Sequence, residues 1–250
     1  MIVDDVANLI RYNIVDKLKA TPVHTEYDTV SAEGVDIVNE MWECPGMRKL
    51  HLETGHTQQF GKLSVLHCVL FPDPGYPLPI FGCDIVATPK TVTAAIVDVS
   101  PVRHMVEIYP DIAEICNSFK FDDRRVLPLW GDEIFSPHCQ FLRLKDGRAQ
   151  LDYQYLLHDC LNEFTDRVLT SEHDPNWVHQ MLRMDDQIYY CKQQRKNKKT
   201  IAVLSNWFDP LFARKYIDEV LFDIPTKSVS YTHLRAHETV LDLVCRLLLE

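Results

Sequence analysis

Three short apolar segments carry titratable side chains at positions that a strand would bury. They are residues 48–54 (RKLHLET), 62–71 (KLSVLHCVLF) and 80–87 (IFGCDIVA). Because side chains alternate across a strand, His51 and Glu53 share one face of the first segment. In the second and third segments, His67 and Asp84 each share a face with apolar side chains. If the three strands are neighbours, two histidines and two carboxyl groups meet in an aliphatic setting. That combination suits proton transfer to a bound ligand.

Asp84 is the sharpest anomaly, because an unpaired buried charge is costly and such groups pair, change their pKa or serve a ligand. The alternative for Asp84 is a structural one, in which its carboxylate bridges backbone amides at a bulge beside Gly82. The alternative for His67 is a hydrogen-bonded core residue. Sequence pattern alone leaves these alternatives open, since it does not show that the strands are adjacent.

His51, Glu53 and His67 could also suggest a metal-dependent enzyme. The spacing is HxE on a strand, without an HExxH helix or a dense His/Cys cluster, so we expect no metal site. The chain has no GxGxxG, Walker or GxSxG motif. The usual dinucleotide, ATP and serine-hydrolase interpretations therefore lack support.

A basic cluster, QQRKNKKT at residues 193–200, stands out in an acidic chain. The plain interpretation is a solvated loop or helix start. The functional one is a site for an anionic ligand or an acidic partner. Arg124 and Arg125 offer further side chains that could clamp a carboxylate.

Composition narrows the class of protein. The 250 residues include 26 Lys and Arg against 36 Asp and Glu, a net charge of −10, which argues against general nucleic-acid binding. No apolar run approaches the ~18 to 20 residues of a membrane helix, and no signal or transit peptide is seen, so we expect a cytoplasmic protein away from membranes. The eight cysteines form no CxxC pair and indicate buried thiols in a reducing compartment.

Periodicity predicts helices over 3–19, 103–118, 151–168, 175–194 and 200–220, and strands over the three segments above, 92–99 and an edge strand at 139–144. Consecutive strands with short links, flanked by helices, favour an antiparallel sheet covered on both faces. We expect one domain over 1–228. Residues 229–250 resemble a translated sequencing adapter and are treated as a non-native tail; the alternative is an amphipathic C-terminal helix.

Several segments, in order along most of the chain, resemble the ferredoxin-dependent bilin reductases. They are MRKLHLE (47–53), LHCVLFPDPGYPLPIFGCDIVA (66–87), AAIVDVSP (94–101), LPLWGDEIFS (127–136), YYCKQQRKNKKT (189–200) and YIDEVLFD (216–223). The resemblance implies a three-layer α/β/α sandwich with a central antiparallel sheet. It further implies a monomer that reduces biliverdin IXα by four electrons to phycocyanobilin. Reduced [2Fe-2S] ferredoxin would supply electrons singly, through bilin radicals, and no metal, flavin or nicotinamide would be bound.

The resemblance also implies roles for single residues. His67 and Asp84 match the family's central proton-donating pair. Glu53 matches the acid associated with reduction of the D-ring vinyl group, and His51 matches a residue of the same proton network. A carboxylic acid kept partly protonated by a desolvated site suits such a task, and Asp84 is our candidate for it.

Arg125 and Lys199 match residues that hold the two propionates, with Asn197 nearby on the same segment. The chain departs from the family at Lys198, where many members have Asp, and this puts the regiochemistry of the reduction in doubt. Two alternatives therefore stay open: the same chemistry yielding phycoerythrobilin, or a non-catalytic bilin carrier.

Overall fold

A single antiparallel sheet organises the computed structural model, which describes residues 1–58, 62–101 and 109–225. Its strands run in the order β1-β3-β4-β5-β6-β7-β8, and β2 pairs with β3. The strands are β1 (Thr21–Val23), β2 (Thr29–Ala32), β3 (Val35–Cys44), β4 (Met47–Thr57), β5 (Ser64–Pro72), β6 (Ile80–Ala87), β7 (Val92–Ser100) and β8 (Gln140–Leu144). The long strands β4, β5 and β6 lie at its centre, where both faces can be covered.

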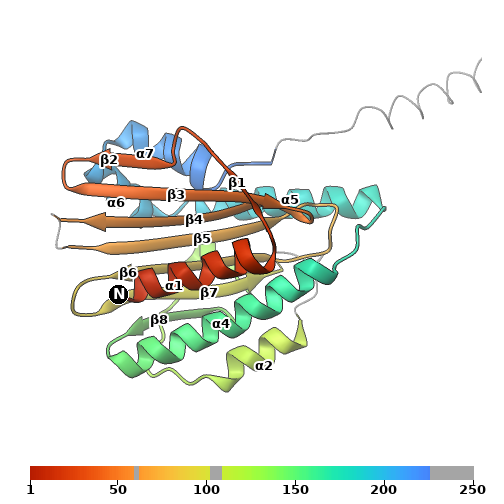
Figure 1. The fold of residues 1–250 in the computed structure, drawn as a ribbon, viewed down its shortest axis with the longest axis horizontal. Coiled ribbons are helices and arrows are strands. Elements are labelled where there is room, and N and C mark those ends of the chain that lie inside the picture. Colours follow the sequence, from red (N-terminus) through yellow and green to blue (C-terminus); the bar gives the residue numbers. More distant parts are fainter. Residues whose placement is uncertain (59–61, 102–108, 226–250) are drawn as a thin grey trace, which may run out of the picture.

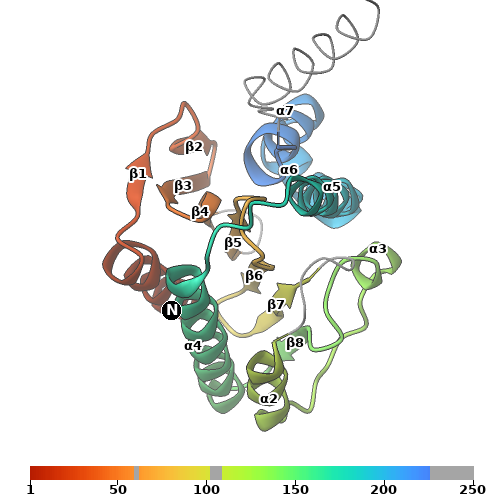
Figure 2. The same cartoon turned by 90° about the vertical axis from the view of Figure 1, so that its right-hand side faces the viewer.

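Helices cover both faces of the sheet (Figure 2). On one side, α1 (Ile2–Arg11), the π-helical turn η1 (Tyr12–Lys17), α2 (Pro110–Ser118) and α4 (Gly147–Thr170) bury side chains such as Leu52 and Leu66. On the other lie α3 (Leu129–Asp132), α5 (Trp177–Gln194), α6 (Lys198–Trp207), α7 (Pro210–Tyr216) and the turn η2 (Ile217–Leu221). The predicted three-layer α/β/α sandwich is confirmed.

Turn and capping chemistry explains where the elements begin and end. Pro45 and Gly46 make the tight β3–β4 turn, and Gly46 has the positive φ (82°) that a type II turn requires at its third position. The predicted helix over 200–220 is broken instead. Asp209 caps α7 by accepting hydrogen bonds from the amides of Leu211 and Phe212, and Pro210 occupies the first helical position.

The other predicted elements are found with shifted ends. The helix predicted over 103–118 begins at Pro110, and residues 102–108 lie outside the described residues. The tail at 229–250 also lies outside them. Strands β1, β2 and β3 were not predicted, although β3 alternates between buried and exposed positions along its first half.

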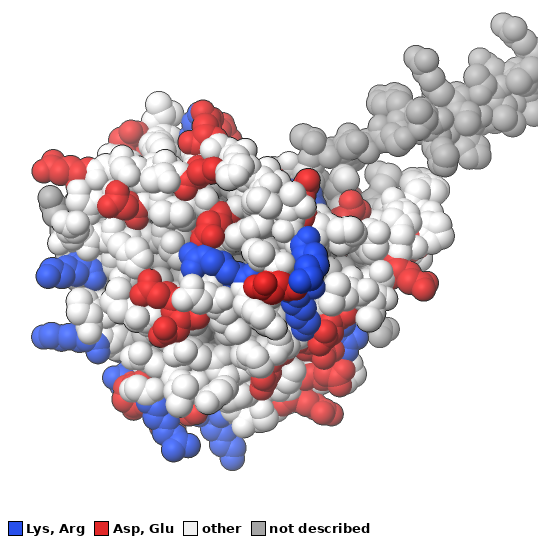
Figure 3. Space-filling view, viewed as in Figure 1, with Lys and Arg blue, Asp and Glu red and all other residues white. Residues whose placement is uncertain are grey.

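The distribution of charged side chains and the hydropathy of the helices agree with what the composition indicated. In the view of Figure 3, acidic and basic side chains are interspersed rather than gathered into one basic field. None of the helices in the described part of the chain is long and apolar enough to cross a membrane.

Two cations on β4 hold the C-terminal end of the described chain against the sheet. Asp223 receives Arg48 Nη1 and Lys49 Nζ, each at 2.6 Å, and Lys49 also donates to the Val220 carbonyl. Burial opposes ionisation of Asp223, but Lys49 and Arg48 outweigh it and lower its pKa. The bond to Val220 ties η2, and the ion pair ties the residues after it, to the strand that carries His51 and Glu53.

We expect Asp223→Asn to lower the free energy of unfolding by about 3 kcal/mol, because it leaves the largely buried Lys49 ammonium without its counter-charge. Asp152→Asn is the matched control: its partner Arg148 is exposed and 3.6 Å away, so the loss should stay below about 0.5 kcal/mol. Urea unfolding measures both. Since the folded-state pKa of Asp223 is depressed, its contribution is present near neutral pH and is lost as the pH falls; equal losses for both variants would contradict this view.

Candidate functional site

Strand register brings the titratable side chains into one row across the sheet. Glu53 on β4 pairs with His67 on β5, which pairs with Asp84 on β6. The row continues outward to Asn39 on β3, the partner of Glu53, and to Ile96 on β7, the partner of Asp84. The assumption that the three strands are neighbours is thereby confirmed.

His67 and Asp84 form a closely coupled pair. His67 Nδ1 lies 2.5 Å from Asp84 Oδ1. Burial alone would lower the pKa of His67, but the Asp84 carboxylate raises it above the ordinary value. The short contact therefore sets the pair to hold a shared proton between Nδ1 and Oδ1. The Asp84 side chain is 44% exposed, so it faces open space rather than the dry core expected from its strand.

Glu53 is the most deeply enclosed carboxyl group of the row. It is 6% exposed, and its Oε2 lies 2.6 Å from the hydroxyl of Tyr216 on α7. Burial raises its pKa, partly offset by the neighbouring charge of His67. A raised pKa favours the protonated form of the carboxyl group, which is the form that can give a proton to a ligand.

His51 lies next to this row, on the same face of β4 and two residues before Glu53. It is fully buried, and burial together with Lys49 and His67 lowers its pKa well below the ordinary value. Its ring packs edge-on against His67, with centroids 5.8 Å apart. His51 Nδ1 and His67 Nε2 are both buried and have no hydrogen-bond partner among the described residues.

The row forms part of the floor of a cavity of about 560 Å³, within the range of small-molecule sites. Glu53, His67 and Asp84 line it together with aliphatic side chains of β5, β6 and β7. The opposite walls come from the segment 125–135, from α6 and from η2 with the residue after it. Aromatic side chains line the cavity as well: Trp130 and Phe135 on that segment, Trp207 on α6, Phe222 directly after η2, and Phe141 on β8.

Basic groups stand at the cavity wall on two sides. Arg125, stacked over Phe141 at 4.8 Å, lies on one segment, and Lys198 and Lys199 open α6 on another. Asn197 caps that helix by accepting hydrogen bonds from the Lys199 and Thr200 amides. The walls thus offer cations that an anionic ligand could bridge, above an apolar floor with few convergent polar groups.

Seven residues predicted from the sequence can be placed. Glu53, His67, Asp84, Arg125, Asn197 and Lys199 all line the cavity, and His51 contacts the row from behind. Arg195 of the basic cluster turns elsewhere, since it pairs with Asp218 at 3.0 Å and donates to the Phe222 carbonyl.

Asn39 and Tyr216 were not predicted as part of the site. A polar Asn in the alternating strand segment VDIVNEMWEC was the available signal for Asn39, because it is a buried amide among apolar positions. Tyr216 carried no such signal, since it reaches Glu53 only through tertiary packing across 163 residues.

Metal-binding geometry is a separate question. Within the ranges that the structure describes, no group of three or more His, Cys, Asp and Glu side chains is arranged to hold a metal ion. Asp84 and Glu53 instead face a histidine and a tyrosine. The side chains of the row are thus engaged in hydrogen bonds suited to moving protons.

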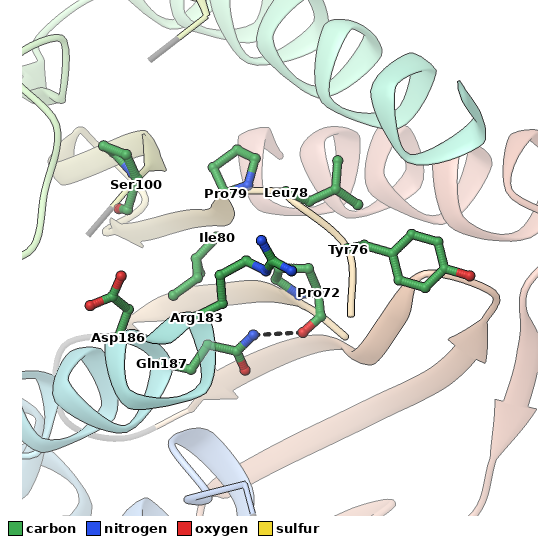
Figure 4. Close-up of a pocket in the computed structure, with 10 residues that line it drawn as sticks. Pro72, Tyr76, Leu78, Pro79, Ile80, Ser100, Arg183, Asp186 and Gln187 are labelled. Atoms are coloured by element: carbon green, nitrogen blue, oxygen red, sulfur yellow. Dashed lines mark hydrogen bonds between the residues drawn. The ribbon is translucent and has the colours of Figure 1, made fainter. Parts of the chain in front are cut away.

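A second, smaller hollow lies between the proline-rich link that joins β5 to β6 and helix α5 (Figure 4). Its volume is about 10 Å³, which is at most the size of one water molecule. Two side chains of α5 close it: Gln187 donates to the Pro72 carbonyl at 2.6 Å, and Arg183 donates to the Pro74 carbonyl at 2.7 Å. These bonds fix α5 to β5 and to the link that follows it. Because this hollow is too small for a ligand, the large cavity is the candidate site.

Known proteins with similar sequences and folds agree with one another. A curated phycocyanobilin:ferredoxin oxidoreductase from a strain of Prochlorococcus marinus is 37% identical, over 89% of this chain and 92% of its own length. Another of that name, from Synechococcus sp. (strain CC9902), is 40% identical over 84% of this chain and 83% of its own.

Among solved structures, tomato phytochromobilin synthase in complex with biliverdin superimposes with a TM-score of 0.75. The match covers 88% of this chain and 85% of that one at 15% identity, and so concerns the fold. The family model for ferredoxin-dependent bilin reductases matches residues 6–223. The chain therefore belongs to the ferredoxin-dependent bilin reductase family.

Proposed function

We propose that this protein reduces biliverdin IXα to phycocyanobilin, taking up four electrons from reduced [2Fe-2S] ferredoxin and four protons in single-electron steps. The observation that carries the proposal is the cavity whose floor holds Glu53, His67 and Asp84 and whose walls hold Arg125 and Lys199. Biliverdin is a large, flat, mostly apolar molecule with two carboxylates, so it needs this combination. Arg125 and Lys199 would hold the two propionates.

The proton chemistry of the proposal follows from the row of side chains. Protonation of a pyrrole nitrogen or a lactam oxygen makes the bilin easier to reduce by each incoming electron. The shared proton of His67 and Asp84 would supply the first transfer, and Glu53 would serve the D-ring vinyl group. His51, neutral because of its burial, would tune His67 rather than donate.

Electron delivery requires a docking site for an acidic ferredoxin. Lys196, Lys198 and Lys199 lie together at the cavity wall and offer local positive charge despite the net charge of −10. Such charge steers an acidic partner at modest ionic strength. A donor docked there would be close to the bilin, which favours electron transfer without a cofactor bound to this chain.

The product is the part of the proposal that has a specific competitor. Glu53 favours reduction of the D-ring vinyl group and hence phycocyanobilin. Lys198 lines the cavity at the position where the family pattern has Asp; this weakens the inference to phycocyanobilin and leaves phycoerythrobilin as the second candidate. Anaerobic turnover of biliverdin with reduced ferredoxin, followed by chromatography against authentic bilins, decides between them. Tight binding without turnover would instead make the protein a carrier and overturn the proposal.

We expect Asp84→Asn to bind biliverdin but to reduce it at least about 100-fold more slowly, because the amide cannot share a proton with His67. Single-turnover spectra under reducing conditions would follow the loss of biliverdin. Asp152→Asn, a half-buried position on α4 that does not line the cavity, should turn over like the wild type. Full activity in Asp84→Asn would remove Asp84 from the central role.

We expect Glu53→Gln to divert the product towards one that retains the D-ring vinyl group while biliverdin is still consumed. In the wild type the neutral acid is the donor, so the share of fully reduced product should fall as the pH rises through the raised pKa of Glu53. That pH dependence should vanish in Glu53→Gln. An unchanged product from the variant at every pH would show that another group protonates the D ring.

A further inference from the structure

The side-chain amide of Asn39 determines which groups around Glu53 donate hydrogen bonds and which accept them. Asn39 Nδ2 lies 2.7 Å from the backbone carbonyl of Tyr27. A carbonyl only accepts, so the nitrogen of the amide must face it. This places Asn39 Oδ1, which also only accepts, on the side of His51 and Tyr216.

Two donors converge on that oxygen. His51 Nε2 lies 2.9 Å from Asn39 Oδ1, so Nε2 carries the ring proton. Because burial and neighbouring charge lower the pKa of His51, the ring is neutral and Nδ1 holds a lone pair. The tautomer of His51 is thus set by an amide on the adjacent strand.

The hydroxyl of Tyr216 is the second donor. It lies 2.7 Å from Asn39 Oδ1 and 2.6 Å from Glu53 Oε2, but it has a single proton to donate. If Glu53 were ionised, one of these two contacts would bring lone pairs of two acceptor oxygens together. If Glu53 is neutral, its own proton goes to the Tyr216 oxygen, the Tyr216 proton goes to Asn39, and both contacts are hydrogen bonds.

We propose that Asn39 and Tyr216 are positioning residues that hold Glu53 in its neutral acid form and His51 as the Nε2–H tautomer. Neither residue is part of the cavity lining, and both are buried, so they act through Glu53 and His51. After Glu53 gives its proton away, Tyr216 can turn its own proton from Asn39 to the new carboxylate. Asn39 therefore opposes ionisation of Glu53 by competing for that proton.

The catalytic consequence rests on the proposed function: a bilin in the cavity would meet Glu53 already protonated. The other titratable groups that act on Glu53 are His67 on β5 and Asp84 on β6, and neither is altered in the variants below. The hydrogen-bond pattern itself is tested without substrate. A failure of this inference is thereby separated from a failure of the proposed function.

The test is the pKa of Glu53 in the full, substrate-free chain. It is read from the infrared carbonyl band of the protonated acid, assigned as the band lost in Glu53→Gln. We expect Asn39→Leu to lower this pKa by about one unit, a roughly tenfold rise in the acid dissociation constant, because the Tyr216 proton is freed for the carboxylate. Leu keeps the branched skeleton of the Asn side chain, with methyl groups in place of the amide atoms, and fills the space, so added water does not mimic the effect.

Two comparisons isolate the route of the effect. In a Tyr216→Phe background, Asn39→Leu should leave the Glu53 pKa unchanged, because the proton that both oxygens compete for is gone. Tyr27→Phe is the matched control: its ring lies 6.1 Å from that of Tyr216, but its hydroxyl donates to Glu219 on the surface, so the Glu53 pKa should not change.

An unchanged or raised Glu53 pKa in Asn39→Leu would overturn the inference, as would an equal effect with and without the Tyr216 hydroxyl. If Asn39→Leu does not fold, nitrogen NMR of wild-type His51 at neutral pH gives the answer. Protonation at Nε2 is expected, and protonation at Nδ1 contradicts the proposal. In an active enzyme, Asn39→Leu should also move the pH at which fully reduced product declines to lower values.

Discussion

The antiparallel register of β3, β4, β5 and β6 is the constraint on which the site depends. It sets Asn39, Glu53, His67 and Asp84 side by side across four strands. A slip of one residue in any pairing would turn a whole strand over and send its polar side chain into the opposite apolar layer. That layer contains side chains of α1 and α4 and the strand residues that alternate with the titratable ones. Its apolar side chains are buried together in only one register. The core on one face thus fixes the chemistry on the other.

Placing four titratable groups on a largely buried face has an electrostatic cost, and the structure offsets it by pairing. His67 and Asp84 share one short contact, and Glu53 and His51 are linked through Tyr216 and Asn39. Burial shifts the pKa of Glu53 upward and that of His51 downward, so both are driven towards neutral forms. His67 is driven the other way by the Asp84 carboxylate. One face of the sheet therefore holds an acid, a neutral base and the His67–Asp84 pair across three adjacent strands.

How much of this could be read from the sequence differs from element to element. Alternation in 48–54, 62–71 and 80–87 predicted correctly which side chains share a face, because a strand has a period of two. The contact of Tyr216 with Glu53 could not be predicted, since Tyr216 arrives from α7 by packing. Asn39 was missed although it is a polar residue in an alternating segment that the Pro45–Gly46 turn joins to β4. The predicted helix over 200–220 missed the stop at Asp209 and Pro210, where capping chemistry outweighs helical periodicity. Likewise, composition identified the basic cluster but could not separate Arg195, which pairs with Asp218, from the lysines at the cavity.

In this site the groups that would bind the ligand and the groups that would donate protons lie on different elements, and this affects how the product can change. In the proposed function, Arg125 and the start of α6 would hold the ligand's carboxylates; both lie at or next to loops, which can vary without disturbing the sheet. Protons would come from the row on the sheet, where each group is held by strand register and by a hydrogen-bond partner. A substitution at the wall, such as Lys198, can then shift how a ligand lies over the row while leaving the donors unaltered. A substitution behind the row, at Asn39 or Tyr216, would change the protonation of Glu53 and leave the grip alone. Selection among ring positions thus has two separable physical origins, the placement of the ligand and the state of the acid beneath it.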